Sequence, residues 1–203
     1  MIAAQPKRGV QVLFSGMLQL LATFFFSSIH WPTQQPPPQR PVLFIGNHQS
    51  WWDGILVFIL HQKIWKRPFF AMMLFPELEK RRFLRFIGAF SVRKNHRSIL
   101  ESLHYSLELL EKPNSVLVFP QGRLESQFVS PLHLEKGIQY LIKHLPTQAE
   151  IWALSIHYSM TDSIRAQCHI YVQPLAARTP QEVEAEWNAF HQSCIELQKQ
   201  QWI

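Results

Sequence analysis

Six short, largely apolar runs, separated by stretches with helical spacing, constrain the fold of this chain most strongly. The first, Val42–Ile45, is wholly apolar and lies between Pro41 and Gly46, as expected for a strand buried on both faces. The other runs are 69–72, 89–92, 116–119, 151–157 and 168–173. This alternation predicts one α/β domain, with a mostly parallel or mixed central sheet flanked by helices.

One segment between these runs and the terminal segment have a clear helical pattern. Between residues 95 and 112, isoleucine and leucine recur at intervals of three and four, and Pro113 follows. Apolar residues recur in the same way within 181–200. A chain of 203 residues with 47% hydrophobic content is large enough to bury one core.

The N-terminal region differs from the rest of the chain. Residues 9–39 contain no charged residue, and 10–31 is long and apolar enough for a membrane helix. Glutamines and serines dilute this stretch, so an interfacial segment and a buried first helix of a soluble domain remain alternatives. We expect 1–40 to be a hydrophobic, membrane-associating helical segment with a proline-rich connector, and 41–203 to be the catalytic domain.

Lys7 and Arg8 precede the apolar stretch, as in a secretory signal, but no small-residue cleavage site follows. The segment is therefore interpreted as a retained anchor on the cytoplasmic face of a membrane. Two clusters mix basic and aromatic residues, which suits either a membrane interface or a solvated helix face. They are Lys63, Trp65, Lys66 and Arg67, and Lys80, Arg81, Arg82, Phe83, Arg85 and Phe86.

The formal charge of +6 suits anionic lipid, an acidic carrier protein or nucleic acid. The sequence has no helix-turn-helix, zinc-finger or aromatic-strand signature, so no nucleic-acid partner is expected. Cys168 and Cys194 argue against a disulfide framework and fit a reduced cytosolic setting. With His169 and His191 they could offer four ligands, but the spacing does not resemble common zinc motifs. We expect core cysteines and no metal.

His48 and Asp53 are the strongest catalytic candidates. They lie five positions apart, directly after the Val42–Ile45 run, where a parallel strand would end. A carboxylate that accepts a hydrogen bond from one ring nitrogen fixes the tautomer, so the other nitrogen can remove a proton from a hydroxyl. A structural alternative is that Ser50 and Asp53 form a capping box at a helix start.

Two further clusters follow strands. Arg93 ends the run that begins at Gly88, and a guanidinium there could clamp an anion or simply be solvated. Gln121, Gly122 and Arg123 follow Phe119-Pro120, in a turn that could present backbone amides to an oxyanion and an arginine to an anionic group. Taken singly, that segment is an ordinary turn.

Together the three clusters resemble the glycerolipid acyltransferase family, which includes the 1-acylglycerol-3-phosphate acyltransferases. Asn47–Asp53 resembles its first block, Asn-His-x-x-x-x-Asp. Gly88–Arg93 resembles the second, and Phe119–Gly122 falls where Phe-Pro-Glu-Gly-Thr-Arg is expected. The resemblance implies transfer of a fatty acyl group from acyl-coenzyme A or acyl carrier protein to a hydroxyl of a membrane lipid. His48 would be the base, oriented by Asp53, and no cofactor would be needed.

The third block departs from the family pattern. Gln121 replaces a glutamate, and Arg123 comes one position early. The acceptor is therefore expected to be either lysophosphatidic acid-like or diverged, for example a glycolipid or a glycosylated terpenoid. A catalytically silent lipid-binding protein is the alternative. No Gly-x-Ser-x-Gly elbow supports Ser50 as a hydrolase nucleophile, and His61, His104 and His144 are expected to be ordinary surface or partly buried residues.

Overall fold

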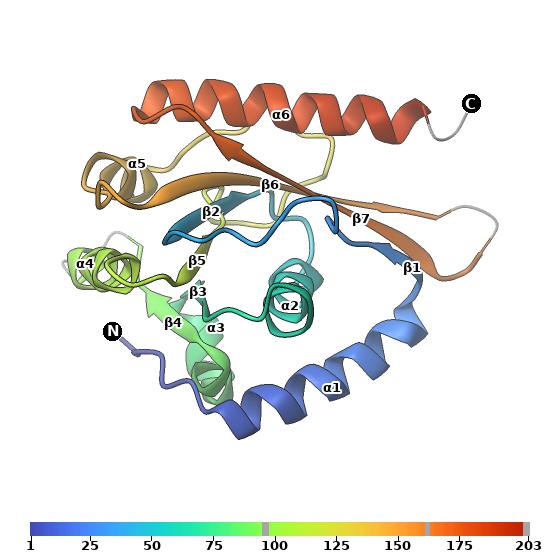
Figure 1. Ribbon diagram of the computed structural model, residues 1–203, viewed down its shortest axis with the longest axis horizontal. Coiled ribbons are helices and arrows are strands. Elements are labelled where there is room, and N and C mark those ends of the chain that lie inside the picture. The colour runs from blue at the N-terminus through green and yellow to red at the C-terminus, as the bar shows by residue number, and fades with distance from the viewer. Residues whose placement is uncertain (95–97, 161–162, 201–203) are drawn as a thin grey trace.

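A seven-stranded mixed sheet organises the computed structural model, which describes residues 1–94, 98–160 and 163–200 (Figure 1). The strand order is β1-β7-β6-β2-β5-β3-β4. The five strands from β6 to β4 are parallel, β7 is antiparallel to β6, and β1 is parallel to β7. The bounds are β1 Phe26–His30, β2 Val42–Gly46, β3 Phe69–Leu74, β4 Ala89–Val92, β5 Ser115–Val118, β6 Glu150–Ser159 and β7 Ala166–Leu175. All six predicted strands are present, and the predicted mixed α/β architecture is confirmed.

Helices cover both faces of this sheet. The N-terminal helix α1 (Arg8–Phe25) and α2 (Trp52–Ile59), which continues as the π-helical η1 (Leu60–Trp65), lie on one face. The other face carries α4 (Ile99–Leu110), α5 (Lys136–Lys143) and α6 (Pro180–Gln200) (Figure 1). The short α3 (Phe75–Lys80) and the 3₁₀ helix η2 (Arg82–Ile87) connect β3 to β4. Residues 95–97 of the predicted helix 95–112 lie outside the described residues.

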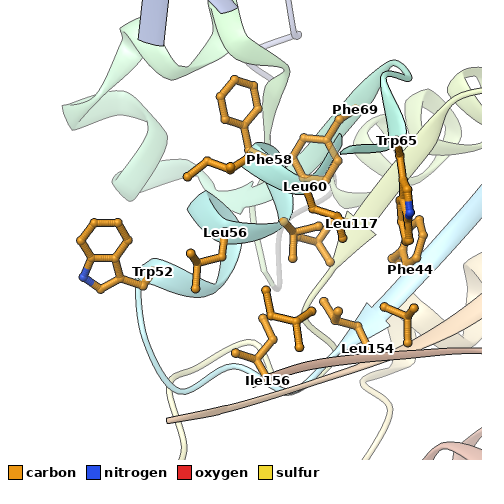
Figure 2. Packing of buried hydrophobic residues seen from close by; sticks show 14 of the residues in the cluster. Phe44, Trp52, Leu56, Phe58, Leu60, Trp65, Phe69, Leu117, Leu154 and Ile156 are labelled. Atoms are coloured by element: carbon orange, nitrogen blue, oxygen red, sulfur yellow. The ribbon is translucent and has the colours of Figure 1, made fainter. Parts of the chain in front are cut away.

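The apolar character of β2 follows from burial on both faces. Leu43 and Ile45 pack with Trp187 of α6, whereas Phe44 packs against the α2 side. Figure 2 shows the hydrophobic cluster that contains Phe44, in which side chains of α2 and η1 lie over Leu117 of β5 and Leu154 of β6. Apolar burial of this kind is the main favourable contribution to folding. A strand that is apolar on both faces is therefore expected in the interior of the sheet, covered by helices on each side.

The sheet extends across the predicted boundary between residues 40 and 41. The strand β1 pairs with β7, and the Ile2 amide and carbonyl both bond to Ser91 at the opposite edge. Residues before Pro41 therefore belong to the same folded body as the rest. The proline-rich stretch itself contains no helix or strand, as expected.

Trp65, expected at the surface, and His61, expected at the surface or partly buried, are both buried. The Trp65 ring packs against Phe44 and Trp152, so the first basic cluster lacks the exposed ring expected of a membrane interface. The His61 ring lies against those of Phe44, Trp65 and Phe69, and its Nδ1 lies 2.8 Å from the Val57 carbonyl oxygen. Cys168 and Cys194 are both free and buried, as expected.

Candidate active site

The candidate site lies at one edge of the sheet. Because β2, β5 and β6 are parallel neighbours, their carboxyl ends meet there. The end of β2 leads to His48, the end of β5 leads to Gln121, and β6 ends beside Tyr158. Asn47 joins β2 to β6, since its side chain donates to and accepts from the Ile156 backbone, both at 2.8 Å. This brings residues from three separate parts of the sequence to one place.

The His48 and Asp53 side chains are in direct contact. Nδ1 of His48 lies 2.9 Å from Oδ2 of Asp53. A carboxylate can only accept, so Nδ1 carries the hydrogen and Nε2 is the nitrogen available to a substrate. The ring stacks on Phe119 with centroids 4.0 Å apart, and 23% of the His48 side chain is exposed, whereas Asp53 is fully buried. The imidazole is thus held on two sides and open on a third.

Asp53 is held by several donors besides His48. Its Oδ2 accepts from the backbone amides of Gln49 and Ser50, and its Oδ1 accepts from the Tyr158 hydroxyl at 2.7 Å. Ser50 Oγ in turn accepts from the Trp52 amide. Asp53 thus reaches back to the Ser50 amide, as in the predicted capping box, but the Ser50 hydroxyl accepts from Trp52 and not from the Asp53 amide, so only half of the box is present. Burial, followed by the charge of Asp53, raises the pKa of Tyr158, so its hydroxyl stays protonated and donates.

Gln121 and Glu125 fasten the loop after β5 to the loop after β2. Oε1 of Gln121 accepts from the His48 amide at 2.7 Å, and its Nε2 donates to Oε2 of Glu125 at 2.6 Å. The Glu125 amide donates to the His48 carbonyl oxygen at 2.7 Å. Hydrogen bonds from Gln121 and then Arg123 hold the pKa of the Glu125 carboxyl below its usual value. The backbone amide of His48 is therefore held by Gln121, and its backbone carbonyl oxygen is held by Glu125.

The remaining predicted residues lie farther from the imidazole or are already engaged. Arg123 is 77% exposed and pairs with Glu125 Oε1 at 2.7 Å. The Gly122 amide donates to the Phe119 carbonyl oxygen, so it is not a free oxyanion donor. Arg93 ends β4 at the same edge, but β3 and β5 separate it from β2, a span of roughly 15 Å at the usual strand spacing. Its guanidinium stacks on Phe75.

Two open pockets flank the loop after β5. The first, of about 480 Å³, includes Gln49, Glu125 and Tyr158 in its lining. The second, of about 510 Å³, includes Gln121, Arg123 and Glu125. Within residues 1–94, 98–160 and 163–200, no three His, Cys, Asp or Glu side chains cluster as a metal ion would require. His48 itself lines neither pocket, but Gln49 of the first is its neighbour in the chain, and Gln121 of the second bonds its amide.

Comparison with known proteins identifies the family. The family model described as Acyltransferase matches residues 29–178, about three quarters of the chain. The chain belongs to the acyltransferase family. The matched acyltransferase region begins in β1 and includes every strand from β2 to β7.

A solved structure has the same fold. It is the 1-acyl-sn-glycerophosphate (LPA) acyltransferase PlsC from Thermotoga maritima, with a TM-score of 0.65 and 16% sequence identity. The match covers 92% of this chain and 79% of that one. At this identity the likeness establishes the acyltransferase fold. A search of curated proteins finds no significant match.

Sequence reasoning missed two residues of this site. Tyr158 lies one position beyond the predicted strand 151–157, and Glu125 follows the third block by three positions. The signal for Tyr158 is its place at the carboxyl end of a strand parallel to β2. The signal for Glu125 is a lone carboxylate just after a block that has lost its glutamate.

Proposed function

We propose that this protein transfers a fatty acyl group from acyl-coenzyme A or acyl carrier protein to a hydroxyl of a lipid acceptor, with His48 as general base and Asp53 as its orienting partner. The supporting observation is the 2.9 Å contact between His48 Nδ1 and the buried Asp53 carboxylate. A base held in this way needs no nucleophilic serine or cysteine. The acceptor is either lysophosphatidic acid-like or a diverged lipid, as the altered third block suggests.

In the proposed reaction, Nε2 of His48 takes the proton of the acceptor hydroxyl as its oxygen attacks the thioester carbonyl. The new carbon–oxygen bond gives a tetrahedral oxyanion, which collapses as the carbon–sulfur bond breaks. The imidazolium then returns its proton to the departing thiolate. The Asp53 carboxylate stabilises the imidazolium between these two steps.

Replacing His48 with alanine tests the proposal directly. Positioned proton transfer contributes typically about a hundred- to ten-thousand-fold in rate, so we expect kcat to fall by at least about a hundredfold. Thiol release from acyl-coenzyme A or acyl carrier protein and the acylated lipid product are both measured. His144→Ala, which removes an exposed histidine at the end of α5, serves as the matched control.

The same experiment separates the enzyme from a catalytically silent lipid-binding protein. A silent protein would bind lipid but release no thiol above the background rate. Equal turnover by the wild type and His48→Ala would contradict the proposal.

We further propose that α1 lies in the plane of one leaflet instead of crossing the bilayer. By length and composition α1 could span a membrane. However, both of its ends are fixed to the same body. The Lys7 amide before it bonds to the Phe86 carbonyl oxygen, and its last residue leads directly into β1. The cytoplasmic face of the membrane is part of this proposal.

The surface of α1 fits this placement. Ser15, Leu18 and Ala22 face the protein. On the other side, Leu13, Met17, Leu20 and Phe24 follow each other at intervals of three and four and are exposed, Leu13 by 78%. The side chain of Phe14 contacts Phe83 beside the second basic cluster, and at the far end Phe25 contacts Trp52 beside the His48 loop. A lipid surface along α1 would therefore reach the candidate site.

Charged substitutions on the exposed apolar face test membrane placement without deleting a strand. Burying a leucine contributes about 1.5–3 kcal/mol, so Leu13→Glu with Leu20→Glu should weaken binding to anionic vesicles by at least about a hundredfold. Cosedimentation with vesicles measures it. Gln19→Glu with Thr23→Glu adds the same charge on the polar side of α1 and is the control. An equal loss of vesicle binding in the two double variants would count against the apolar face as the binding surface.

A further inference from the structure

Glu125 lies between the two pockets that flank the candidate site. It lines both of them, and its carboxylate is bonded to Gln121, which holds the His48 amide. Only 16% of the Glu125 side chain is exposed. A headgroup in either pocket would therefore meet a carboxylate whose pKa is held below its usual value. Because this carboxylate also holds Arg123, an anionic headgroup would meet a carboxylate at close range and an arginine that is already paired.

The basic residues of the second pocket are already neutralised. Arg123 pairs with Glu125, and Lys94 Nζ lies 2.6 Å from Glu135 Oε1. His133 lies 3.3 Å from Glu184 Oε1. A phosphate entering there would have to compete with these carboxylates for Arg123 and Lys94. Arg93, the other cation expected to hold an anion, is stacked on Phe75.

The first pocket has the chemistry of an uncharged, hydroxyl-rich ligand. Among the described residues that line it, none is basic. Gln49 and Ser126 add polar side chains beside Glu125, and Phe128, 61% exposed, offers a ring on which the apolar face of a sugar can stack. Carboxylate, amide and hydroxyl oxygens accept hydrogen bonds from sugar hydroxyls. The pocket also touches Tyr158, which bonds Asp53.

Resting on the function proposed above, we infer that Glu125 determines acceptor specificity, by excluding phosphomonoester headgroups and favouring an uncharged polyhydroxyl headgroup in the first pocket. The replacement of the family glutamate by Gln121 belongs to the same arrangement. Gln121 can accept from the His48 amide and donate to Glu125 at once. A glutamate at position 121 would place two carboxylates in contact, so Gln121 and Glu125 depend on each other.

The test compares two acceptors of equal chain length in the same micelles, a monoacylglycerol phosphate and an alkyl glucoside. Acyl-coenzyme A and acyl carrier protein thioesters are supplied in parallel. We expect the wild type to favour the glucoside. In Glu125→Gln, the ratio of kcat/KM should move toward the phosphate acceptor by at least about tenfold, because a carboxylate is lost and Arg123 is released. Glu108→Gln, which removes an exposed carboxylate on α4, should leave the ratio unchanged.

Exchanging the two side chains gives a second, independent measurement. Gln121→Glu alone should lower turnover about tenfold and keep the preference for the glucoside, since Glu125 remains. The double variant Gln121→Glu, Glu125→Gln again pairs one amide with one carboxylate. It should recover turnover and show the same ratio of kcat/KM for the two acceptors as Glu125→Gln. A double variant no better than Gln121→Glu would overturn the proposed dependence of these residues on each other.

The outcomes separate this inference from the function on which it rests. If the wild type shows no His48-dependent transfer to either acceptor, the proposed function fails, and the inference fails with it. If transfer depends on His48 but the wild type favours the phosphate acceptor, only the inference is overturned. An unchanged ratio in Glu125→Gln overturns it as well.

Discussion

Asp53 is the residue on which the geometry of the site depends. It is fully buried and accepts from the His48 ring, two backbone amides and the Tyr158 hydroxyl. A buried carboxylate without such partners would be costly, so the same bonds stabilise the fold and orient the His48 ring. Tyr158 is the partner contributed by a distant part of the chain, since 105 residues separate it from Asp53.

Removing the Tyr158 hydroxyl should therefore impair catalysis without affecting substrate binding. We expect Tyr158→Phe to lower kcat about tenfold, because a hydrogen bond to a charged group contributes about 1.5–3 kcal/mol. The KM for the acyl thioester should stay within about twofold, since Tyr158 acts through Asp53. Steady-state kinetics with a fixed acceptor give both values. A large rise in KM with kcat intact would instead identify Tyr158 as a substrate-binding residue.

At this scale the sequence predicts short-range contacts better than long-range ones. His48 and Asp53 lie in one seven-residue block, so their contact requires only the turn between β2 and α2. The Tyr158 bond depends on how β6 pairs with β2, and the Glu125 bonds depend on the course of the loop after β5. Neither is encoded in local spacing.

At the scale of elements, the junction of η2 and β4 requires a glycine. Gly88 has φ of 113°, and a Cβ at this position would collide with the Phe69 carbonyl oxygen of the neighbouring strand. The strand β4 leads to Arg93 at the carboxyl ends of the parallel strands, so this junction also fixes the position of Arg93.

Gly88→Ala should destabilise the protein by about 2–4 kcal/mol, from positive-φ strain together with the backbone collision. Urea unfolding measures the change. Gly16→Ala is the comparison, because a Cβ there meets nothing within 4 Å and a helical glycine costs roughly 0.5–1 kcal/mol relative to alanine. Gly16→Ala should therefore raise the free energy of unfolding, whereas Gly88→Ala should lower it. Similar losses in both variants would show that Gly88 has no special conformational role.

Elements at the edge of the sheet were harder to predict than those inside it. The run Val42–Ile45 is buried on both faces and is purely apolar, so its pattern was decisive. The strand β1 lies at an edge, carries Ser27, Ser28 and His30, and continues directly from an apolar helix. Nothing in its composition distinguishes it from the end of that helix.

For the whole molecule, buried histidines should govern stability in mild acid. The buried His169 and His157 lie side by side on β7 and β6, next to the exposed His30 of β1, and Ser155 links His157 to the buried His191 of α6. Burial, followed by the charges of His191 and His169, lowers the pKa of His157 to about 3. Burial and His30 lower the pKa of His169 to about 4. Burial alone lowers the pKa of His191.

The sign of the effect follows from proton binding. Well above pH 6.5 the imidazoles of His157, His169 and His191 are neutral in both the folded and the unfolded state. Below it the unfolded chain binds protons that the folded chain does not, so the free energy of unfolding should fall by up to about 1.4 kcal/mol per pH unit for each buried histidine, until the folded pKa is reached. Unfolding by urea between pH 7.5 and 5 checks this, and His157→Gln should reduce the slope. A flat profile would contradict it.

The overall architecture was the most predictable level, because alternation of apolar runs and helical spacing suffices to predict a mixed α/β sheet. The way in which the N-terminal region completes that sheet was not predictable. Its consequence concerns any attempt to obtain a shorter, more tractable protein. A chain trimmed to begin at Pro41 would lose β1 and leave the backbone of β7 unpaired along an open edge. Such edges recruit strands from other molecules, so trimming would favour aggregates over monomers.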